Sequence, residues 1–333
     1  MRELAYHRAT DAAEAVALVT ANPSARFLAG GSNLVDHLKL GITEPELLVD
    51  VSRLPLDRVE DLPDGGLRIG ANVRNSDLGA HPRVRTDYPV VAEAVLAGAS
   101  PQIRHQATTG GNLLQRTRCV YFQDASTPCN KREPGSGCSA IGGYGRYNAV
   151  LGASPDCVTT HPSDLAVALA AVDARVVVLG TDGERRLPMS ELHRLPGDEP
   201  QRDTTLAHGE LITAVELPAD PVVQVSGYHK ARDRASFAFA LVSVAACLDL
   251  DGDTVRDVRI AWGGVAHKPW RATRAEEALR GTRFSEDAAR DAATLELEAA
   301  ETDEETAYKV PMVRNATALV LGRLARATTE GAA

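Results

Sequence analysis

The chain has 333 residues, of which 44% are hydrophobic and 24% are charged. This composition is that of an ordinary globular protein and excludes a chain that is disordered over most of its length. The formal net charge is −9, and aromatic residues make up only 4% of the chain. Both values argue against nucleic-acid binding, because phosphate contacts need positive charge and base stacking needs aromatic rings.

The sequence shows no segment that predicts membrane insertion or export. No apolar stretch approaches the roughly 20 residues that a bilayer-spanning helix needs. Residues 1–16 have neither the apolar core of a signal peptide nor a twin-arginine pair. We therefore expect no membrane span, and either a cytoplasmic location or a periplasmic one reached by co-export with a signal-bearing partner.

Helix and strand signals alternate over the first part of the chain. The Ala-rich segment 11–22 predicts a helix that ends at Asn22-Pro23. Further helices are expected over residues 34–40, 86–100 and 165–172, the last capped by Ser163 or Asp164. Strands are expected over residues 26–29, 47–51, 67–71, 175–180 and 211–217.

The Pro-bounded segment 218–221 marks the main domain boundary. After it come three predicted strands and then three predicted helices, which is an α+β pattern. The strands are expected over residues 223–230, 236–250 and 255–263, and the helices over residues 272–279, 286–298 and 311–324. The sequence thus predicts a first domain over residues 1–220 and a smaller one over residues 221–330.

Two glycine-rich loops lie in the first domain. In residues 27–34 (FLAGGSNL) a strand runs into two glycines and a helix start, and residues 107–113 (ATTGGNL) repeat this chemistry. Such loops let backbone amides approach a phosphate closely, and two of them suit a dinucleotide. Two unrelated tight turns are the alternative. Neither loop has the third glycine of G-x-G-x-x-G, so a Rossmann site is not expected.

Four of the five cysteines fall in a glycine-rich segment, residues 115–160, that has little apolar periodicity. Their spacing, C-x9-C-x8-C-x18-C, matches neither paired zinc motifs nor ferredoxin-type runs. Four thiolates there could hold a [4Fe–4S] cluster, a zinc ion or no metal. An odd number of cysteines without an export signal argues against a disulfide framework. The fifth, Cys247, lies in an apolar strand and is expected to be a buried, unreactive thiol.

Two single polar residues are further candidates for ligand binding. Asp164 could accept hydrogen bonds from ribose hydroxyls, or it could cap a helix. Lys230 ends a predicted strand, and a solvated basic edge is the alternative for it. His105 and His161 have no nucleophile or metal-like spacing near them, so we expect them to be ordinary polar residues.

Short motifs in a fixed order make the chain resemble a known family. AGGSN, TGGN, PSDL, YHKAR and GGVAHKPWRA occur in that order. This order resembles the FAD-binding medium subunit of xanthine dehydrogenase-type molybdenum hydroxylases, over roughly residues 1–325. The cysteine-bearing insertion is most similar to that of the flavoprotein subunit of bacterial periplasmic aldehyde oxidoreductases, where it carries a [4Fe–4S] cluster. The β subunit of hydroxybenzoyl-CoA reductase is a more distant relative with such a cluster.

The resemblance implies a fold and a set of site residues. The fold is a vanillyl-alcohol-oxidase-type FAD domain with lobes of about 1–55 and 56–220, followed by an α+β domain with a three-stranded sheet and helices. Asp164 would bind the ribose or adenine side of FAD, and Lys230 would lie near the isoalloxazine or ribityl chain. The implied pyrophosphate residues are Phe27, Leu28, Ala29, Gly30, Gly31, Ser32, Asn33, Leu34, Thr108, Gly111 and Asn112. The implied cluster ligands are Cys119, Cys129, Cys138 and Cys157.

The resemblance also implies an oxidoreductase subunit without a catalytic residue of its own. An aldehyde would be oxidised on a large molybdopterin-binding subunit, and a small [2Fe–2S] subunit would pass the electrons to FAD here and on to an external acceptor. The chain lacks the plant-type [2Fe–2S] motif, so those centres belong to partners of a heterotrimer. The alternatives are a subunit of a xanthine dehydrogenase- or hydroxybenzoyl-CoA reductase-type enzyme, a scaffold with structural zinc, and a stand-alone FAD oxidase.

Overall fold

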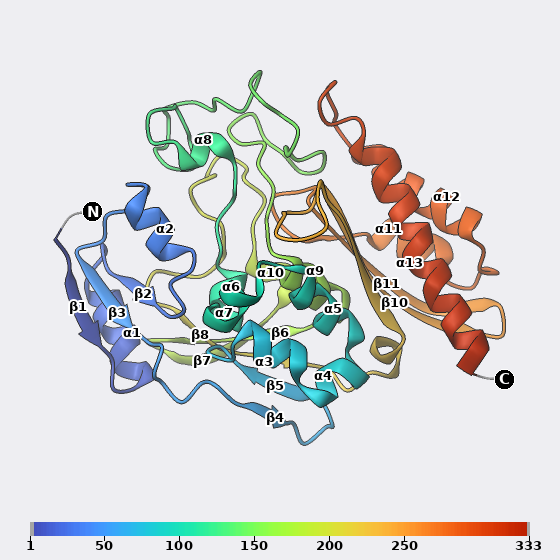
Figure 1. Ribbon diagram of the computed structural model, residues 1–333, viewed down its shortest axis with the longest axis horizontal. Coiled ribbons are helices and arrows are strands. Elements are labelled where there is room, and N and C mark those ends of the chain that lie inside the picture. Colours follow the sequence, from blue (N-terminus) through green and yellow to red (C-terminus); the bar gives the residue numbers. More distant parts are fainter. Residues whose placement is uncertain (1–2, 332–333) are drawn as a thin grey trace.

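The computed structural model describes residues 3–331, which form helices around three separate sheets (Figure 1). This mixed architecture confirms the expected α+β class. Over the described residues, no helix is both long and apolar enough to cross a membrane.

The N-terminal part is a small parallel sheet with the strand order β1-β3-β2. Each pair of consecutive strands is joined by a helix, as parallel pairing requires. Asp11 caps the first helix by accepting a hydrogen bond from the Glu14 amide. The elements are β1 (Ala5–Arg8), α1 (Ala12–Ala21), β2 (Arg26–Leu28), α2 (Leu34–Lys39) and β3 (Leu47–Asp50).

The middle part is an antiparallel sheet in the order β4-β5-β8-β6-β7, covered by helices on the side that faces the cysteine segment (Figure 1). Its strands are β4 (Val59–Asp61), β5 (Leu67–Gly70), β6 (Arg175–Gly180), β7 (Gly183–Pro188) and β8 (Leu211–Leu217). Its helices are α3 (Asn75–Ala80), α4 (Pro82–Asp87), α5 (Pro89–Ala97), α6 (Pro101–Gln106), α7 (Thr109–Leu113), α8 (Val120–Gln123), α9 (Asp164–Ala171) and α10 (Met189–Leu192).

The expected single helix over residues 86–100 is wrong. Two helices meet at Tyr88 and Pro89, where Tyr88 has non-helical angles (φ −137°, ψ 57°). Proline disfavours a helical conformation of the residue before it but is well placed to start a helix, so α5 begins at Pro89. At the start of α9, Ser163 is the capping residue, because its side chain accepts from the Ala166 amide.

The C-terminal part is an antiparallel sheet in the order β12-β11-β10-β9, with three helices against one face. The three expected long strands are present, and a two-residue strand joins them. The elements are β9 (Ser226–Ala231), β10 (Val242–Asp251), β11 (Thr254–Gly263), β12 (Trp270–Arg271), α11 (Thr273–Leu279), α12 (Glu286–Glu296) and α13 (Lys309–Gly331), with 3₁₀ turns η1 (Pro221–Gln224) and η2 (Leu297–Ala299).

Two expected strand starts in this part are wrong. The strand expected over residues 223–230 starts only at Ser226, because Val223 and Gln224 belong to a 3₁₀ turn that begins at Pro221. Residues 236–241 form a loop rather than the start of β10, and Phe237 within it has a φ of 51°. A left-handed residue interrupts a strand, so β10 starts only at Val242.

Strand β10 joins the middle and C-terminal parts, because both of its faces are buried. Val244 and Ala246 lie in the core shared with α11, α12 and α13. Ala245 and Cys247 point the other way, into the core shared with α5 and α9. Cys247 is fully buried, and burial raises the pKa of its thiol to about 12, as expected for an unreactive cysteine.

Candidate functional site

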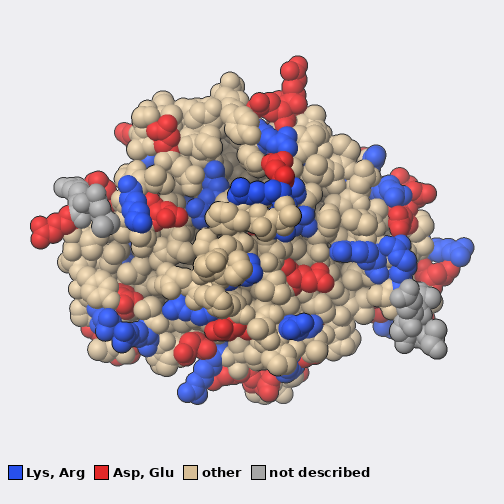
Figure 2. All heavy atoms as spheres, viewed as in Figure 1, with Lys and Arg blue, Asp and Glu red and all other residues tan. Residues whose placement is uncertain are grey.

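A cavity of about 690 Å³ lies between the glycine-rich loops, the start of α9 and the strand-connecting loop before β10. The face of the molecule in Figure 2 is hollowed, and Lys and Arg side chains gather beside the hollow. The cavity brings together residues that are up to about two hundred positions apart in the chain. Six of the residues expected to bind FAD line it: Ser32, Asn33, Gly111, Asn112, Asp164 and Lys230.

The other expected FAD residues do not line this cavity but shape its wall. Phe27 and Leu28 belong to β2, which delivers the chain to the first loop, and Leu34 starts α2. Thr108 is buried and caps α7 by accepting from the Gly111 amide. The remaining three are Ala29, Gly30 and Gly31, which connect β2 to Ser32.

The first glycine loop presents backbone amides that the chain itself does not use. Within residues 3–331, no acceptor is found for the amides of residues 30–33. Gly31 adopts a φ of 74°, which favours glycine. A Cβ on Gly30 would lie 2.3 Å from the Gln106 carbonyl oxygen, so the loop and α6 can approach this closely only without a side chain there. Successive free amides of this kind attract anionic groups.

The second glycine loop is different, because its amides are bound within the protein. Thr109 donates to Val73 O, Gly110 to Ala71 O and Asn112 to Thr108 O. What this loop offers to the cavity is the Asn112 side chain, whose Oδ1 accepts from the Ser163 hydroxyl at 2.6 Å. The two loops therefore share a sequence pattern but not a hydrogen-bonding role.

A buried ion pair lies at the floor of the cavity. Lys230 Nζ lies 2.7 Å from Asp164 Oδ2, and the side chains are only 4% and 8% exposed. Tyr228 donates its hydroxyl to the other carboxylate oxygen at 2.6 Å. Removal of either charged partner would leave an uncompensated charge in a low-dielectric site. The pair therefore fixes the start of α9 to strand β9.

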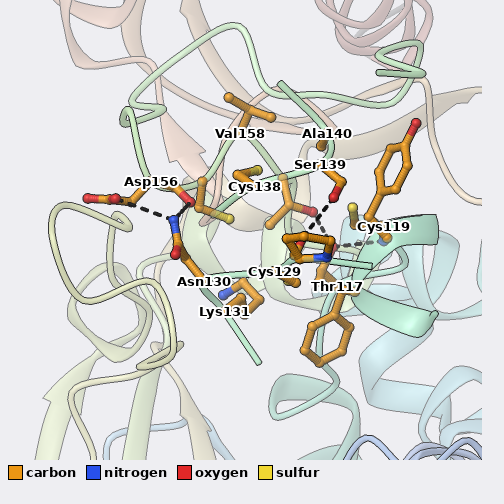
Figure 3. Close-up of a pocket in the computed structure, with 15 residues that line it drawn as sticks. Thr117, Cys119, Cys129, Asn130, Lys131, Cys138, Ser139, Ala140, Asp156 and Val158 are labelled. Carbon is orange, nitrogen blue, oxygen red and sulfur yellow. Dashed lines mark hydrogen bonds between the residues drawn. The ribbon is translucent and has the colours of Figure 1, made fainter. Parts of the chain in front are cut away.

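The four clustered cysteines meet at a second, narrow cavity within the loop that contains α8 (Figure 3). Cys129 and Cys138 face each other across an isolated β-bridge. Burial raises the pKa of Cys119, and it raises that of Cys157 to about 11. Over residues 3–331, no three His, Cys, Asp or Glu side chains are grouped tightly enough, as placed, to hold a single metal ion.

The two cavities share part of one wall. Thr117, Cys119 and Thr159 border both of them. The two threonine hydroxyls are hydrogen-bonded to each other, and the Cys119 amide donates to Thr117 Oγ1 at 3.1 Å. A cysteine of the second cavity is therefore also in contact with the space of the first.

Sequence reasoning missed two residues of the large cavity, Arg118 and Phe239. Arg118 lines it, and its guanidinium lies 5.2 Å from the ring centre of Phe239, which also lines it. Burial lowers the pKa of Arg118, which makes it a poorly hydrated cation. The position of Arg118 next to Cys119 was the available signal. No signal existed for Phe239, because its loop was expected to be a strand.

His161, expected to be an ordinary polar residue, lines the large cavity and lies against His193, with the two ring planes inclined by 48°. Their ring centres are 4.1 Å apart. Burial lowers the pKa of His193 to about 4 and that of His161 well below its usual value. His193 Nε2 donates to the Leu113 carbonyl at 2.8 Å, which ties the helix of the second glycine loop to the segment after α10.

Comparison with known families matches almost the whole chain. The family model described as the FAD binding domain in molybdopterin dehydrogenase matches residues 2–220. The one described as the CO dehydrogenase flavoprotein C-terminal domain matches residues 226–323.

Individual relatives are similar over most of their own length. The FAD-binding subunit of aldehyde oxidoreductase from Escherichia coli K12, PaoB, is 52% identical over 84% of this chain and 86% of its own. The carbon monoxide dehydrogenase medium chain of Hydrogenophaga pseudoflava is 28% identical over 93% and 94%. The solved carbon monoxide dehydrogenase from that organism has a TM-score of 0.75 at 26% identity and covers 96% of each chain.

The buried His193 gives a prediction for the pH dependence of stability. Because its pKa is about 4 in the folded protein and about 6.5 when unfolded, only the unfolded chain takes up this proton between those pH values. The free energy of unfolding should therefore fall as pH falls through this window. Denaturant titrations at several pH values give the free energy of unfolding as a function of pH. In His193→Gln, the slope of this free energy against pH should be shallower by up to about 1.4 kcal/mol per pH unit. His105→Gln, at an exposed histidine, is the control, and equal slopes in both variants would contradict the assignment.

Proposed function

Because the chain belongs to the family of FAD-binding subunits of molybdopterin dehydrogenases, which are oxidoreductases, we propose that it carries FAD in a molybdenum-containing aldehyde oxidoreductase and passes electrons on from its partner subunits. The observation that carries the proposal is the row of four unpartnered amides at residues 30–33 beside a cavity of about 690 Å³. The choice of an aldehyde as substrate class is supported by the 52% identity to an aldehyde oxidoreductase subunit.

The residues of the large cavity fit FAD in charge and shape. The free amides of the first loop, with Ser32 and Asn33, suit a pyrophosphate, which needs several donors and a close backbone. Asn112 offers its side-chain amide from the second loop. Lys230 and Asp164 supply a fixed cation and fixed acceptors for the sugar or ring end. When bound, FAD supplies the ability to take up electrons singly and release them in pairs. We assign the binding residues as Phe27, Leu28, Ala29, Gly30, Gly31, Ser32, Asn33, Leu34, Thr108, Gly111, Asn112, Asp164 and Lys230.

The proposed function requires partner subunits for substrate oxidation and for the first steps of electron transfer. We infer a large molybdopterin-binding subunit that oxidises the substrate and a small [2Fe–2S] subunit that relays electrons, in a heterotrimer with an external electron acceptor. The chain itself would divide at residue 220, with lobes of about 1–55 and 56–220 before a C-terminal domain over 221–330. The match of two separate family models, to residues 2–220 and 226–323, supports this division.

We further propose that Cys119, Cys129, Cys138 and Cys157 hold a [4Fe–4S] cluster. The donor set supports it, since all four thiols border one cavity. A single zinc ion would need its thiolates about 2.3 Å from one point. A cluster binds one cysteine per iron and spreads its ligands over a larger body.

Reduction by substrate tests the proposed function directly. In the chain assembled with its partner subunits, an aldehyde should bleach the flavin absorbance near its visible maxima. The isolated chain should stay oxidised under the same anaerobic conditions, because the site of oxidation lies on a partner. Bleaching of the isolated chain would identify a stand-alone oxidase instead, and no bleaching in the assembled enzyme would remove the electron-transfer role.

The first glycine loop gives a prediction for flavin binding. Gly31→Val places a β-branched residue at a φ of 74° and brings its Cβ to 3.2 Å from a Val35 methyl. Strain of this kind costs about 1–3 kcal/mol. The unliganded loop can relax away from this conformation but FAD binding requires it, so we expect the Kd for FAD to rise by about 5- to 150-fold. Fluorescence titration of the apoprotein measures it. Gly252→Val introduces similar strain (φ 62°) in a distant hairpin and is the control. Equal Kd values for both variants would remove the loop from the site.

The cysteine cavity gives a prediction for metal content. Anaerobically purified protein should contain about four iron atoms per chain, and Cys129→Ser should lose most of them while it keeps flavin. Iron, zinc and flavin are quantified together. Cys247→Ser, at a buried cysteine outside the cavity, should keep its iron. Zinc in place of iron would reassign the loop as a structural zinc site, and unchanged iron in Cys129→Ser would remove that ligand.

A further inference from the structure

A buried lysine lies beside the cysteine cavity and has no role in the proposed flavin site. Lys131 follows Cys129 by two residues and borders the cavity with the four cysteines (Figure 3). Its side chain is 1% exposed. A cation so far from water is costly unless it is paired, and an isolated one would not be retained without a compensating partner.

The partner of Lys131 comes from a distant segment, between α10 and β8. Lys131 Nζ forms an ion pair with Asp203 Oδ1 and donates to the Pro200 carbonyl at 2.6 Å. Arg116 binds the same carboxylate through Nε at 2.6 Å. Its other end donates to the Gln201 carbonyl at 3.3 Å. Two cations of the cysteine segment thus converge on one carboxylate, and the group has a net charge of +1.

This ion-paired group lies directly beside the cysteines. Burial alone would raise the pKa of Asp203, but Arg116 and Lys131 outweigh burial and hold it well below its usual range. Lys131 borders the same cavity as the four cysteines, so its buried ammonium group lies on the side of the cavity that Asp203 anchors.

Neighbouring imidazoles do not add to this positive charge at neutral pH. Burial lowers the pKa of His193 and of His267 to about 4 and that of His161 well below its usual value. All three imidazoles also have electrostatic interactions with Lys131, Asp203 or another of the three rings. With these rings neutral, the charged side chains that border the cysteine cavity are Lys131, whose group with Asp203 and Arg116 has a net charge of +1, and Asp156.

We propose that Lys131, held in place by Asp203, sets the reduction potential of the iron–sulfur cluster bound by the four cysteines. The inference rests on the proposed cluster. When the cluster takes up one electron, no bond forms or breaks and no proton is required, and the cluster with its thiolates becomes more negative by one charge. A buried ammonium group beside the cavity stabilises that charge, because net charge near a cluster and its exclusion from water are what tune its potential.

Two substitutions test the proposal with opposite expected signs. Lys131→Met lowers the charge of the group from +1 to 0 and should shift the cluster midpoint potential to more negative values. Asp203→Asn raises the charge to +2 and should shift the midpoint to more positive values. The measurement is an EPR-monitored redox titration of the full chain, purified anaerobically, with iron and flavin quantified in the same samples.

Lys309→Met is the matched control. Lys309 is also fully buried and donates to backbone carbonyls, those of Asn148 at 2.6 Å and Gly264 at 2.7 Å, but it does not border the cysteine cavity. The cluster midpoint potential of the Lys309→Met variant should equal that of the wild-type protein.

The outcomes separate this inference from the function on which it rests. Opposite shifts in Lys131→Met and Asp203→Asn, with iron retained, support a tuning role. Unchanged midpoints, shifts of the same sign, or a shift as large in Lys309→Met overturn it. Loss of iron from both cavity variants also overturns it, because the group would then only clamp the loop. A wild-type chain without iron refutes the cluster itself, and the inference falls with it.

Discussion

Strand β10 is buried on both faces, and this burial positions the floor of the large cavity. A strand with apolar residues at both even and odd positions cannot leave either face in water. Helix α13, with α12 and α11 packed beside it, covers one face, and α5 and α9 cover the other. This packing brings β9, the neighbour of β10, against α9, and so sets Lys230 and Tyr228 against Asp164. The cavity floor is thus a consequence of how the C-terminal sheet is covered.

The two glycine loops show how one sequence pattern serves two physical purposes. In the second loop, glycine lets α7 pack closely against the end of β5. A Cβ added at Gly110 would lie 3.0 Å from the Cβ of Ala71. Its amides are consumed by that docking. In the first loop, glycine lets the chain pass close to Gln106, while the amides stay free. Over residues 3–331, the first loop therefore has four consecutive amides without an acceptor, whereas the second loop contributes to the cavity through the Asn112 side chain.

Local patterns predicted most of the elements, and tertiary contacts decided the rest. The order of helices and strands, the three long strands after residue 221 and the capping of α9 followed from periodicity and from the preferences of Ser and Pro. The loop before β10 did not, because an apolar run such as residues 236–241 fits a strand or a cavity rim equally well. Sequence spacing could nominate four cysteines, but it could not show that they share one cavity. Nor could it pair Lys131 with Asp203, 72 residues away.

The cysteine segment adds Val150 and Leu151 to the core of the C-terminal part, and polar contacts hold much of the rest of it in place. Glu305 accepts from the Gly145 amide, Tyr308 donates to the Arg146 carbonyl at 2.7 Å, and Lys309 holds the Asn148 carbonyl. On the opposite side, Asp203 holds Lys131 and Arg116. Figure 1 shows the segment arching between the middle helices and the start of α13. The contacts of Tyr308 and Lys309 are made at the start of α13.

Anchoring contacts between charged side chains also have an electrostatic effect on their surroundings. When the charges are buried, they lie beside any group that the segment binds, in an environment with an effective dielectric constant far below that of water. Apolar contacts would place no charge beside the cysteine cavity. The ionic contacts place the positively charged ammonium group of Lys131 there. The wall shared with the larger cavity, by contrast, is made of the neutral pair Thr117 and Thr159 and of Cys119. The ion pair that anchors Lys131 to Asp203 is therefore also what holds a buried cation beside the cysteine cavity.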